Sequence, residues 1–338
     1  MKKEEKLMMN LIQEKRRNFR RNSTKNIFER LTYIFPNDVA PKNYRRNPVA
    51  VFNPGAFIKG KELHVFPRLI FDYYKYVSAV GHFVVNVEDL LDNVIQLPIE
   101  TEIVLWPSNL QEFLGCEDPR VFYENDSIKM LYTGKGYKKW SQEGSPHTDF
   151  LAYAKLNKEY TVLERTYLSI KDNGEEFFPV SMKDSSFLSD CHILTRIDVE
   201  GLRTCWKGQV IGSSIPLESL EPVFFPEEWE TKVGWSTNAL RMENEFLIGW
   251  HAVLKEDLSY KNGLALVSKE GDLLASTDYV LSPRGLIEEY GDRAFVIFGC
   301  GLVIYEDLLI WIGGVSDYAI GFFAAKKREI FSHLRTLC

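Results

Sequence analysis

Hydrophobic side chains make up 45% and charged side chains 26% of the 338 residues, which is enough apolar material for a sizeable core and excludes a disordered chain. The formal charge is −6, and because residues 1–30 hold ten Lys/Arg against four Asp/Glu, the remaining 308 residues carry about −12. An acidic body of this kind argues against nucleic acid as the main partner.

Cysteine usage and the N-terminus indicate the compartment. The five cysteines, Cys116, Cys191, Cys205, Cys300 and Cys338, are scattered, odd in number and without CxxC spacing, which is typical of free thiols in a reducing compartment. The N-terminus has no apolar signal-peptide core, and no run of residues reaches membrane-spanning length. We therefore expect a cytoplasmic protein without a metal site and without a membrane partner.

Residues 2–21 are expected to form one helix, because Leu7, Met8, Leu11 and Ile12 recur at helical spacing among basic residues. Such a segment can be an arm for nucleic acid or membranes, but it more often docks on its own domain or on a neighbouring subunit. We expect it to dock on an acidic surface, with a homo-oligomer through this helix as one possibility. Residues 22–48 are interpreted as a polar connection, so the expected domains are 1–48 and 49–338.

From residue 49 onwards, short alternating runs replace the helical period and fall into a repeat. The first two units, which define the plan, open with Asn or Asp, continue as an apolar run, turn on a polar cluster and return as a second apolar run, and the same plan recurs in the others. The units begin at Asn53, Asp118, Asp184, Asn238 and Gly301, which are 65, 66, 54 and 63 residues apart. Each unit is followed by at least the start of a second strand pair, so one repeat supplies a four-stranded antiparallel sheet.

A single sheet of this kind cannot bury both of its faces, whereas five sheets around a common axis bury them against one another. A large β-sandwich is the alternative, since strand-and-turn patterns are degenerate, but five copies at near-constant spacing favour the propeller. The prediction is therefore an all-β, five-bladed β-propeller with an N-terminal helical extension. Helix should be scarce elsewhere, with residues 326–334 as the one further candidate.

The entry loops of the innermost strands of a propeller form one funnel, so the starts of the repeats should lie close together. A mixture of carboxylates and cations there suits an uncharged polar substrate whose hydroxyls need paired donors and acceptors, with an acid nearby. Aromatic side chains of the same units either stack on sugar faces or are buried in the blades. The polar residues concerned are Asn53, Arg68, Asp118, Lys183, Asp184, Arg196, Lys232, Asn238, His251 and Asp317, and the aromatic ones are Tyr132, Trp235 and Trp250.

The densest polar element is Gly115-Cys116-Glu117-Asp118-Pro119-Arg120, in which two carboxylates and a guanidinium precede an apolar run. Alone, it is explained equally well as a surface turn with an ion pair. An ordered series of further motifs accompanies it: Asn53-Pro54 with Arg68, Lys183-Asp184 with Arg196, Lys232-x-Gly234, Gly249-Trp250-His251, Tyr290-Gly291 and Gly314-x-x-Asp317. This series resembles glycoside hydrolase family 130, the β-mannoside phosphorylase family with a five-bladed propeller fold.

The resemblance implies phosphorolysis of β-mannosides with inversion, which releases α-mannose 1-phosphate and uses inorganic phosphate as co-substrate without a cofactor. Asp118 matches the proton donor of the family, which there acts through a sugar hydroxyl. The matching phosphate-binding positions are Arg196, Lys232 and His251. The matching substrate-binding positions are Asn53, Arg68, Glu117, Lys183, Asp184 and Asp317. The implied partners are therefore an oligosaccharide or glycoside and phosphate.

The sequence departs from the family pattern immediately before Lys183. Phosphorylases of the family usually carry Arg-Asn there, whereas this chain carries Ser181-Met182. Loss of a charge-assisted phosphate contact costs about 1.5–3 kcal/mol, so a β-mannoside hydrolase is an alternative. Glu288 or Glu289 could then supply the base that an inverting hydrolase needs, or form a solvated charge pair. A sugar-binding propeller without activity is the other alternative.

Overall fold

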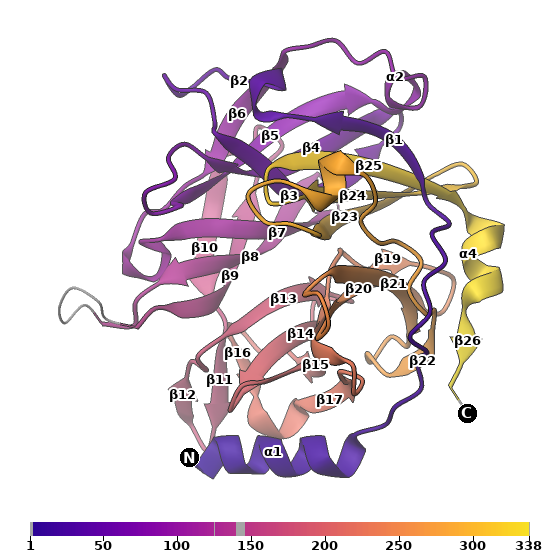
Figure 1. Cartoon of the computed structure of the whole chain (residues 1–338). Coiled ribbons are helices and arrows are strands. Elements are labelled where there is room, and N and C mark those ends of the chain that lie inside the picture. Colours follow the sequence, from indigo (N-terminus) through magenta and orange to yellow (C-terminus); the bar gives the residue numbers. More distant parts are fainter. Residues whose placement is uncertain (1–2, 125, 140–145, 338) are drawn as a thin grey trace.

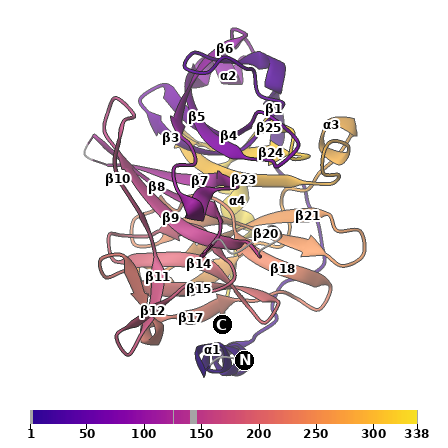
Figure 2. The ribbon, with the colours of Figure 1, turned by 90° about the vertical axis from the view of Figure 1, so that its left-hand side faces the viewer.

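Five antiparallel blades follow one another along the chain and surround a common centre, so the fold is the all-β, five-bladed β-propeller that the repeat predicts (Figures 1 and 2). The first two blades are joined by a single parallel pair between Ser78 and Gly115. The structure is a computed structural model that describes residues 3–124, 126–139 and 146–337. With strands given from the centre outwards, the first blade is β3 (Ala50–Lys59), β4 (Glu62–Ile70), β5 (Ser78–Asn86) and β6 (Ile99–Leu105), and the second is β7 (Gly115–Glu124), β8 (Ser127–Gly136), β9 (Thr148–Leu156) and β10 (Val162–Tyr167). The third blade is β13 (Met182–Phe187), β14 (His192–Val199), β15 (Leu202–Gln209) and β17 (Glu221–Phe224), and the fourth is β18 (Glu230–Trp235) with β19 (Leu240–Arg241), β20 (Phe246–Leu254), β21 (Tyr260–Val267) and β22 (Leu273–Ser276). The fifth blade is β23 (Ile297–Tyr305), β24 (Leu308–Val315), β25 (Ala319–Lys326) and β1 (Glu29–Ile34).

The innermost strands are the first strands of the predicted repeat units. β3 packs on β23 and on β7, and β13 packs on β7 and β18. The fourth unit differs from the prediction, because its first strand begins at Glu230 rather than near Asn238. This strand is interrupted after Trp235, where Arg120 Nε donates a hydrogen bond to the carbonyl of Ser236. The strand resumes as β19. The repeat start predicted at Asn238 therefore corresponds to β19, the short second piece of this strand.

Short accessory elements complete the fold. The expected helix near the C-terminus is α4 (Lys327–His333), and no helix of the described residues is long and apolar enough to cross a membrane. A shared apolar cluster that includes Val51, Ile310 and Phe322 joins the first blade to the last. The other elements are β2 (Val39–Pro41), β11 (Ser169–Asp172), β12 (Glu175–Phe177), β16 (Ser214–Pro216), β26 (Arg335–Thr336), α2 (Val87–Leu91), α3 (Leu286–Glu289) and the 3₁₀ turns Pro36–Asp38, Leu110–Glu112 and Leu217–Ser219.

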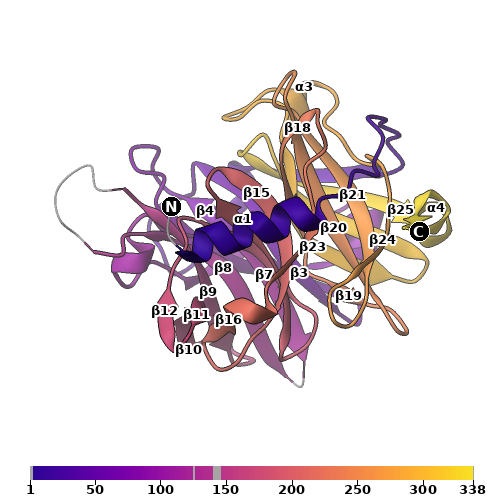
Figure 3. The ribbon, with the colours of Figure 1, turned by 90° about the horizontal axis from the view of Figure 1, so that it is seen from below.

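The N-terminal helix docks on the third blade of its own chain. α1 (Lys3–Lys15) lies across the underside of the molecule and contacts β17 and β14 (Figure 3). Met8 and Ile12 are buried against the apolar side chains of this blade, and Lys15 forms an ion pair of 2.5 Å with Glu221. The predicted N-terminal helix is therefore confirmed, and of the two docking sites left open it occupies the one on its own domain. A homo-oligomer through this helix stays a prediction.

The expected helix over residues 2–21 is wrong beyond Lys15. The backbone N–H groups of Phe19 and Arg20 both donate to the carboxylate of Glu227, at 3.0 and 2.9 Å, instead of to helix carbonyls. The Arg20 guanidinium is buried, forms an ion pair with Glu230 and lies over the ring of Phe224. These contacts fix the chain in an extended path, which a continued helix would break.

The expected polar connection over residues 22–48 is wrong at two strands, β1 and the short β2, which pairs with β6. β1 pairs with β25 in antiparallel register from Glu29 to Ile34 and is the outermost strand of the last blade. The final sheet thus combines strands from both ends of the chain, an arrangement that closes the ring of blades. The domain boundary at residue 48 stays a prediction.

The cysteines are free thiols where the structure describes them. Cys116, Cys205 and Cys300 are buried, and Cys191 is exposed. Cys338 lies outside the described residues. The expectation of a chain without a disulfide framework is therefore confirmed for these four residues, whereas a cytoplasmic location stays a prediction.

Candidate functional site

Three inner strands carry the same local distortion, and each places a polar side chain at the centre. Asn53, Asp118 and Asp184 have φ values of 47°, 52° and 52°, and the strand register shifts at each of them. A β-bulge with a left-handed residue re-aims a side chain, and Asn and Asp tolerate this backbone better than other residues. The Asn or Asp that begins three of the repeat units is therefore required by the backbone as well as by the site.

Asp118 is held on one of its two carboxylate oxygens. Oδ1 accepts hydrogen bonds from Asn53 Nδ2 at 2.9 Å and from the Arg68 guanidinium at 3.4 Å. The same guanidinium donates to Glu117 at 2.8 Å, and its Nε donates to Ser78 at 2.7 Å. Among the described residues, no hydrogen bond occupies Oδ2 of Asp118. One oxygen is thus fixed and the other is left to hold or deliver a proton.

Arg120 connects Asp118 to the third blade. Its guanidinium is buried, donates to the carbonyl of Asp118 at 2.9 Å and forms an ion pair of 3.2 Å with Asp184. Asp184 in turn accepts from Arg196 Nε at 2.6 Å. Burial acts to raise the pKa of Asp184, but Arg196 and then Arg120 outweigh it and hold the pKa well below its usual range. Asp184 is therefore ionised and positions two arginines.

Lys232 and His251 meet beside Arg196, around the ring of Tyr260. Lys232 Nζ donates to the Tyr260 hydroxyl at 2.7 Å, and the His251 ring stacks on Tyr260 with centroids 5.5 Å apart. A Cβ on Gly234 would lie 2.5 Å from the His251 ring and 2.9 Å from the Arg196 side chain. Only glycine permits this close approach, so the Lys232-x-Gly234 motif has a steric reason.

Burial lowers the pKa of both His251 and Lys232 well below their usual values. For Lys232 the nearby Arg196 adds to this effect and Asp184 opposes it, whereas for His251 Asp184 opposes it and Lys232 adds to it. His251 accordingly is a neutral imidazole, whose Nδ1 lies 3.0 Å from Ser236 Oγ. Its Nε2 is buried and has no hydrogen-bond partner in the described part of the chain.

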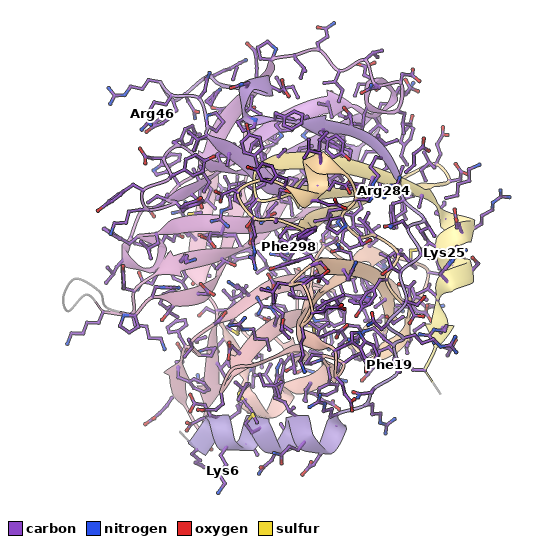
Figure 4. The ribbon with its side chains drawn as sticks, viewed as in Figure 1. Lys6, Phe19, Lys25, Arg46, Arg284 and Phe298 are labelled. Atoms are coloured by element: carbon purple, nitrogen blue, oxygen red, sulfur yellow. The ribbon has the colours of Figure 1, made fainter. Side chains whose placement is uncertain are left out.

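Phe298 of β23 packs between the two parts of this cluster. Its ring centroid lies 4.8 Å from that of His251, and the guanidinium carbon of Arg120 lies 5.3 Å from it. Figure 4 shows Phe298 near the middle of the molecule, where the inner strands meet. The acid and the cation cluster are therefore joined by continuous contacts rather than located on separate surfaces.

Lys183 is also present in the site, but its charge is paired. Lys183 Nζ lies 2.7 Å from Asp149 Oδ2, to which Ser181 also donates, at 2.9 Å. Burial raises the pKa of Asp149, but Lys183 outweighs it and the pKa falls to about 2. Met182 is buried in the core of the third blade. Residues 181 and 182 thus present no cation to a ligand.

Asp317 lies in the turn between β24 and β25 with a φ of 50°. Burial raises its pKa to about 6, against the opposing charges of Arg68 and Arg293 and with further contributions from Asp118 and Asp292. Asp317 thus belongs electrostatically to the Asp118 end of the cluster. The structure therefore brings together all ten residues assigned to catalysis, substrate and phosphate from the sequence, while their roles stay predictions.

Other candidates lie elsewhere or are engaged in the core. The side chains of Tyr132, Trp235 and Trp250 are at most 2% exposed, so they are buried blade residues and not sugar platforms. Glu288 is fully buried, forms an ion pair of 3.0 Å with Arg30 and is no free base. Asn238 uses its side chain to hold the backbone of Leu302 in the neighbouring blade.

Two hollows are candidates for binding a substrate, one along the inner hairpins and one at the outer strands of the first blade. One, of about 1000 Å³, is lined by the turn-side halves of the inner hairpins, including Phe57, Tyr123 and Arg241, and contains none of the site residues except Asn238. The other, of about 750 Å³, is lined by Tyr44, Tyr74, Trp106 and Ser78. Because Ser78 accepts a hydrogen bond from Arg68, the second hollow shares a wall with the Asp118 cluster. The second hollow is therefore the better candidate for holding a substrate next to Asp118.

Comparison with known proteins identifies the family. The sequence model of glycoside hydrolase family 130, described as β-1,4-mannooligosaccharide phosphorylase, matches residues 18–336. The chain belongs to glycoside hydrolase family 130. This confirms the resemblance, and members of the family are phosphorylases or hydrolases that act on mannosides.

Individual relatives of this family 130 chain are distant in sequence but similar over nearly their full length. A β-1,2-mannobiose phosphorylase of Thermoanaerobacter sp. (strain X514) is 21% identical over 304 residues, which cover 86% of this chain and 94% of the relative. A β-1,2-mannobiose phosphorylase of Listeria innocua, solved with β-1,2-mannobiose, gives a TM-score of 0.62 at 19% identity, covering 89% and 96% of the two chains. A structure reported with family 130 hydrolases that target β-1,2 mannosidic linkages in Candida mannan gives 0.63 at 16% identity, covering 93% and 97%.

Two residues of this family 130 site were missed from the sequence. Tyr260 begins β21, and Arg293 lies in the loop before β23, so neither starts a repeat unit. The nearest signal was the Tyr290-Gly291 motif, which marks the loop that carries Arg293. No group of three or more His, Cys, Asp or Glu in the described ranges is arranged to hold a metal ion.

Proposed function

We propose that the chain is an inverting β-mannoside phosphorylase that releases α-mannose 1-phosphate. The observation that carries the proposal is the connection of Asp118 to a cation cluster through Arg120, Asp184 and Arg196. An acid with one free oxygen protonates a leaving group, and a cluster of donors on the same site holds an anionic nucleophile. Membership of family 130 supports this assignment.

The proposed reaction breaks the bond between the anomeric carbon and the glycosidic oxygen. Asp118 supplies the proton that ends on the leaving oxygen, and a phosphate oxygen forms the new bond to the anomeric carbon from the opposite face. The proton of hydrogen phosphate restores the Asp118 carboxyl group, so no proton is gained or lost overall. Because phosphate brings its own nucleophilic oxygen, the second carboxylate of an inverting hydrolase is unnecessary.

The substrate-binding side chains surround the acid. Asn53 and Arg68 donate hydrogen bonds to it, and Arg68 also donates to Glu117. Asp317 lies within electrostatic reach. We assign these residues to the hydroxyl groups of the mannoside that is cleaved, because paired carboxylates and cations match groups that both donate and accept. Lys183 with Asp149 is assigned to the same role.

The leaving-group part of the substrate is assigned to the aromatic hollow. Trp106 and Tyr74 are 57% and 86% exposed, and Tyr44 belongs to the same lining. Exposed aromatic rings with a polar rim suit the alternating apolar faces and hydroxyls of sugars. In the aromatic hollow, an ion pair of 3.6 Å between Arg46 and Asp72 supplies the polar rim. This favours an oligosaccharide, and the named relatives favour a β-1,2 linkage.

A β-mannoside hydrolase is the second candidate, and residues 181 and 182 are the observation that favours it. Ser181 is bound to Asp149 and Met182 is buried, so the chain lacks the usual Arg-Asn at this place. Glu288 is excluded as the base of a hydrolase by its buried contacts with Arg30 and Tyr33. A hydrolase would therefore need another carboxylate.

The deciding experiment is product analysis with a panel of β-mannosides in the presence and absence of inorganic phosphate. Formation of α-mannose 1-phosphate only with phosphate supports the proposal. Release of free mannose at the same rate without phosphate contradicts it and supports the hydrolase. Binding of mannosides without any turnover would indicate the sugar-binding alternative.

A further inference from the structure

Arg293 reaches the cation cluster from a loop that no other site residue uses. Its backbone N–H donates to the carbonyl of Ser316 at 3.0 Å, which ties the loop to the turn that carries Asp317. Its guanidinium carbon lies 5.1 Å from the centroid of the Tyr260 ring. The hydroxyl of the same ring accepts from Lys232, and its face stacks with His251. Arg293 therefore borders the residues expected to bind phosphate.

The positive charge around the expected phosphate site is largely compensated within the protein. Arg196 is paired with Asp184 at 2.6 Å, and Lys183 is paired with Asp149 at 2.7 Å. Burial holds His251 neutral and opposes the charge of Lys232. A phosphate dianion needs cationic donors that are not already committed to carboxylates.

Arg293 is different from these residues because its side chain is exposed and has no hydrogen bond or ion pair with a carboxylate among the described residues. Its charge acts on Asp317 from beyond ion-pair distance. An arginine keeps its charge at all relevant pH values and offers several planar donors that match phosphate oxygens. The buried Nε2 of His251, which lacks a partner, indicates that the cluster is completed by a bound group.

We propose that Arg293 binds the phosphate co-substrate and takes the place of the arginine that the chain lacks at residues 181 and 182. This inference rests on the proposed function, since it assumes that phosphate is the nucleophile. In this arrangement Lys232 and Arg293 both contact the ring of Tyr260, so that both side chains reach the same anion. Arg293 is then a phosphate-binding residue supplied by the last blade's entry loop.

The test compares Arg293→Gln with Arg284→Gln, an exposed arginine nearby in the chain and without a contact to the cluster (Figure 4). The full chain is assayed for phosphorolysis of a β-1,2-mannooligosaccharide at varied phosphate concentration. Arg293→Gln is expected to raise the KM for phosphate about 10- to 100-fold, the range of one lost charge-assisted contact. The KM for the mannoside and the melting temperature should stay unchanged.

Two further measurements distinguish phosphate binding by Arg293 from a merely structural role of this residue. Arg293→Lys, which keeps the charge but loses the planar donors, should recover part of the phosphate affinity. In the reverse reaction, the KM for α-mannose 1-phosphate should rise with Arg293→Gln as well, because the phosphate group occupies the same place. A merely structural role would lower the melting temperature or change the KM for both substrates alike.

The outcomes separate this inference from the proposed function. If the unaltered protein requires phosphate but Arg293→Gln and Arg284→Gln have the same KM for phosphate, the assignment of Arg293 is overturned and the phosphorylase remains. If the unaltered protein cleaves mannosides without phosphate and inorganic phosphate does not raise its melting temperature, the assignment of Arg293 and the proposed phosphorylase function are both overturned.

Discussion

The side-chain amide of Asn53 donates a hydrogen bond of 2.9 Å to Oδ1 of Asp118, across the first two blades. Both residues occupy the left-handed bulge of their inner strand, and a Cβ on Gly314 would lie only 2.0 Å from Asn53 Oδ1. Three blades are thus fitted together at this contact. These contacts restrict rotation of the Asp118 carboxylate, so the fold determines which of its two oxygens is left without a partner among the described residues.

We expect Asp118→Asn to keep the fold and sugar binding but to lose activity by about 10²–10⁴-fold, the usual contribution of a general acid. Asparagine tolerates the φ of 52° and its carbonyl can still accept from Asn53. The measurements are kcat/KM for a natural β-mannoside and mannoside affinity by calorimetry. The reverse reaction from α-mannose 1-phosphate should be lost in parallel.

The matched control is Asp126→Asn, an exposed aspartate in the turn of the same hairpin that also has a positive φ. It should retain normal turnover. An activated aryl mannoside, whose leaving group needs no proton, should partly restore a hydrolytic reaction in Asp118→Asn. Near-normal turnover of a natural mannoside by Asp118→Asn would place the acid on another residue.

The five-bladed fold followed from the sequence because each hairpin repeats the same local pattern, and local patterns are what a sequence displays. The strand at Glu29–Ile34 was missed because its pairing partner lies at the opposite end of the chain. The end of α1 at Lys15 was missed for a similar reason, since Glu227 competes for the backbone N–H groups of Phe19 and Arg20. Tertiary contacts of this separation leave no periodic signal.

The site was predicted as far as its residues begin repeat units or match family motifs. Asp118 and Asp184 could be found because bulged inner strands favour Asp at one position of each repeat. Tyr260 and Arg293 could not, because they reach the cluster from a second-pair strand and an entry loop. Burial was equally hidden, so Trp235 and Trp250 looked available for stacking although both are fully enclosed.

Docking of α1 predicts a position-specific effect on stability. Ile12→Ala should lower the free energy of unfolding by about 2 kcal/mol or more, since Ile12 is 1% exposed in the apolar contact with the third blade. Leu7→Ala, at a side chain that is 48% exposed, should change it by less than about 0.5 kcal/mol. Urea unfolding measures both, and equal effects would contradict the docked arrangement. Dissociation of an oligomer by Ile12→Ala would support the predicted homo-oligomer.

Placement of the leaving-group sugars in the aromatic hollow predicts a dependence on chain length. Trp106→Ala should lower kcat/KM for trisaccharides and longer substrates roughly fivefold or more, the value of about 1 kcal/mol of lost ring contact. The disaccharide should be affected less. Phe331→Ala, at an exposed aromatic side chain of α4, is the control. An unchanged ratio between trisaccharide and disaccharide would remove the hollow from the substrate path.

The raised pKa of Asp317 predicts an unusual dependence of stability on pH. Burial, against Arg68 and Arg293, raises this pKa to about 6, whereas an unfolded aspartate titrates near about 3.9. The folded protein therefore holds the proton more tightly, and the stability gained from it is full below pH ~4 and is lost as the pH rises through ~6. Asparagine has a similar shape and does not ionise.

Asp317→Asn should accordingly unfold at the same temperature as the unaltered protein near pH ~4 and at a higher temperature at pH 7, where the difference approaches about 2–3 kcal/mol. Calorimetric scans at several pH values measure this, and Asp126→Asn should show no such divergence. Activity should fall in Asp317→Asn if the carboxylate binds the mannoside. A variant that is less stable than the unaltered protein at pH 7 would show that Arg68 and Arg293 depend on the Asp317 charge, and the sign of the pKa shift would then be wrong.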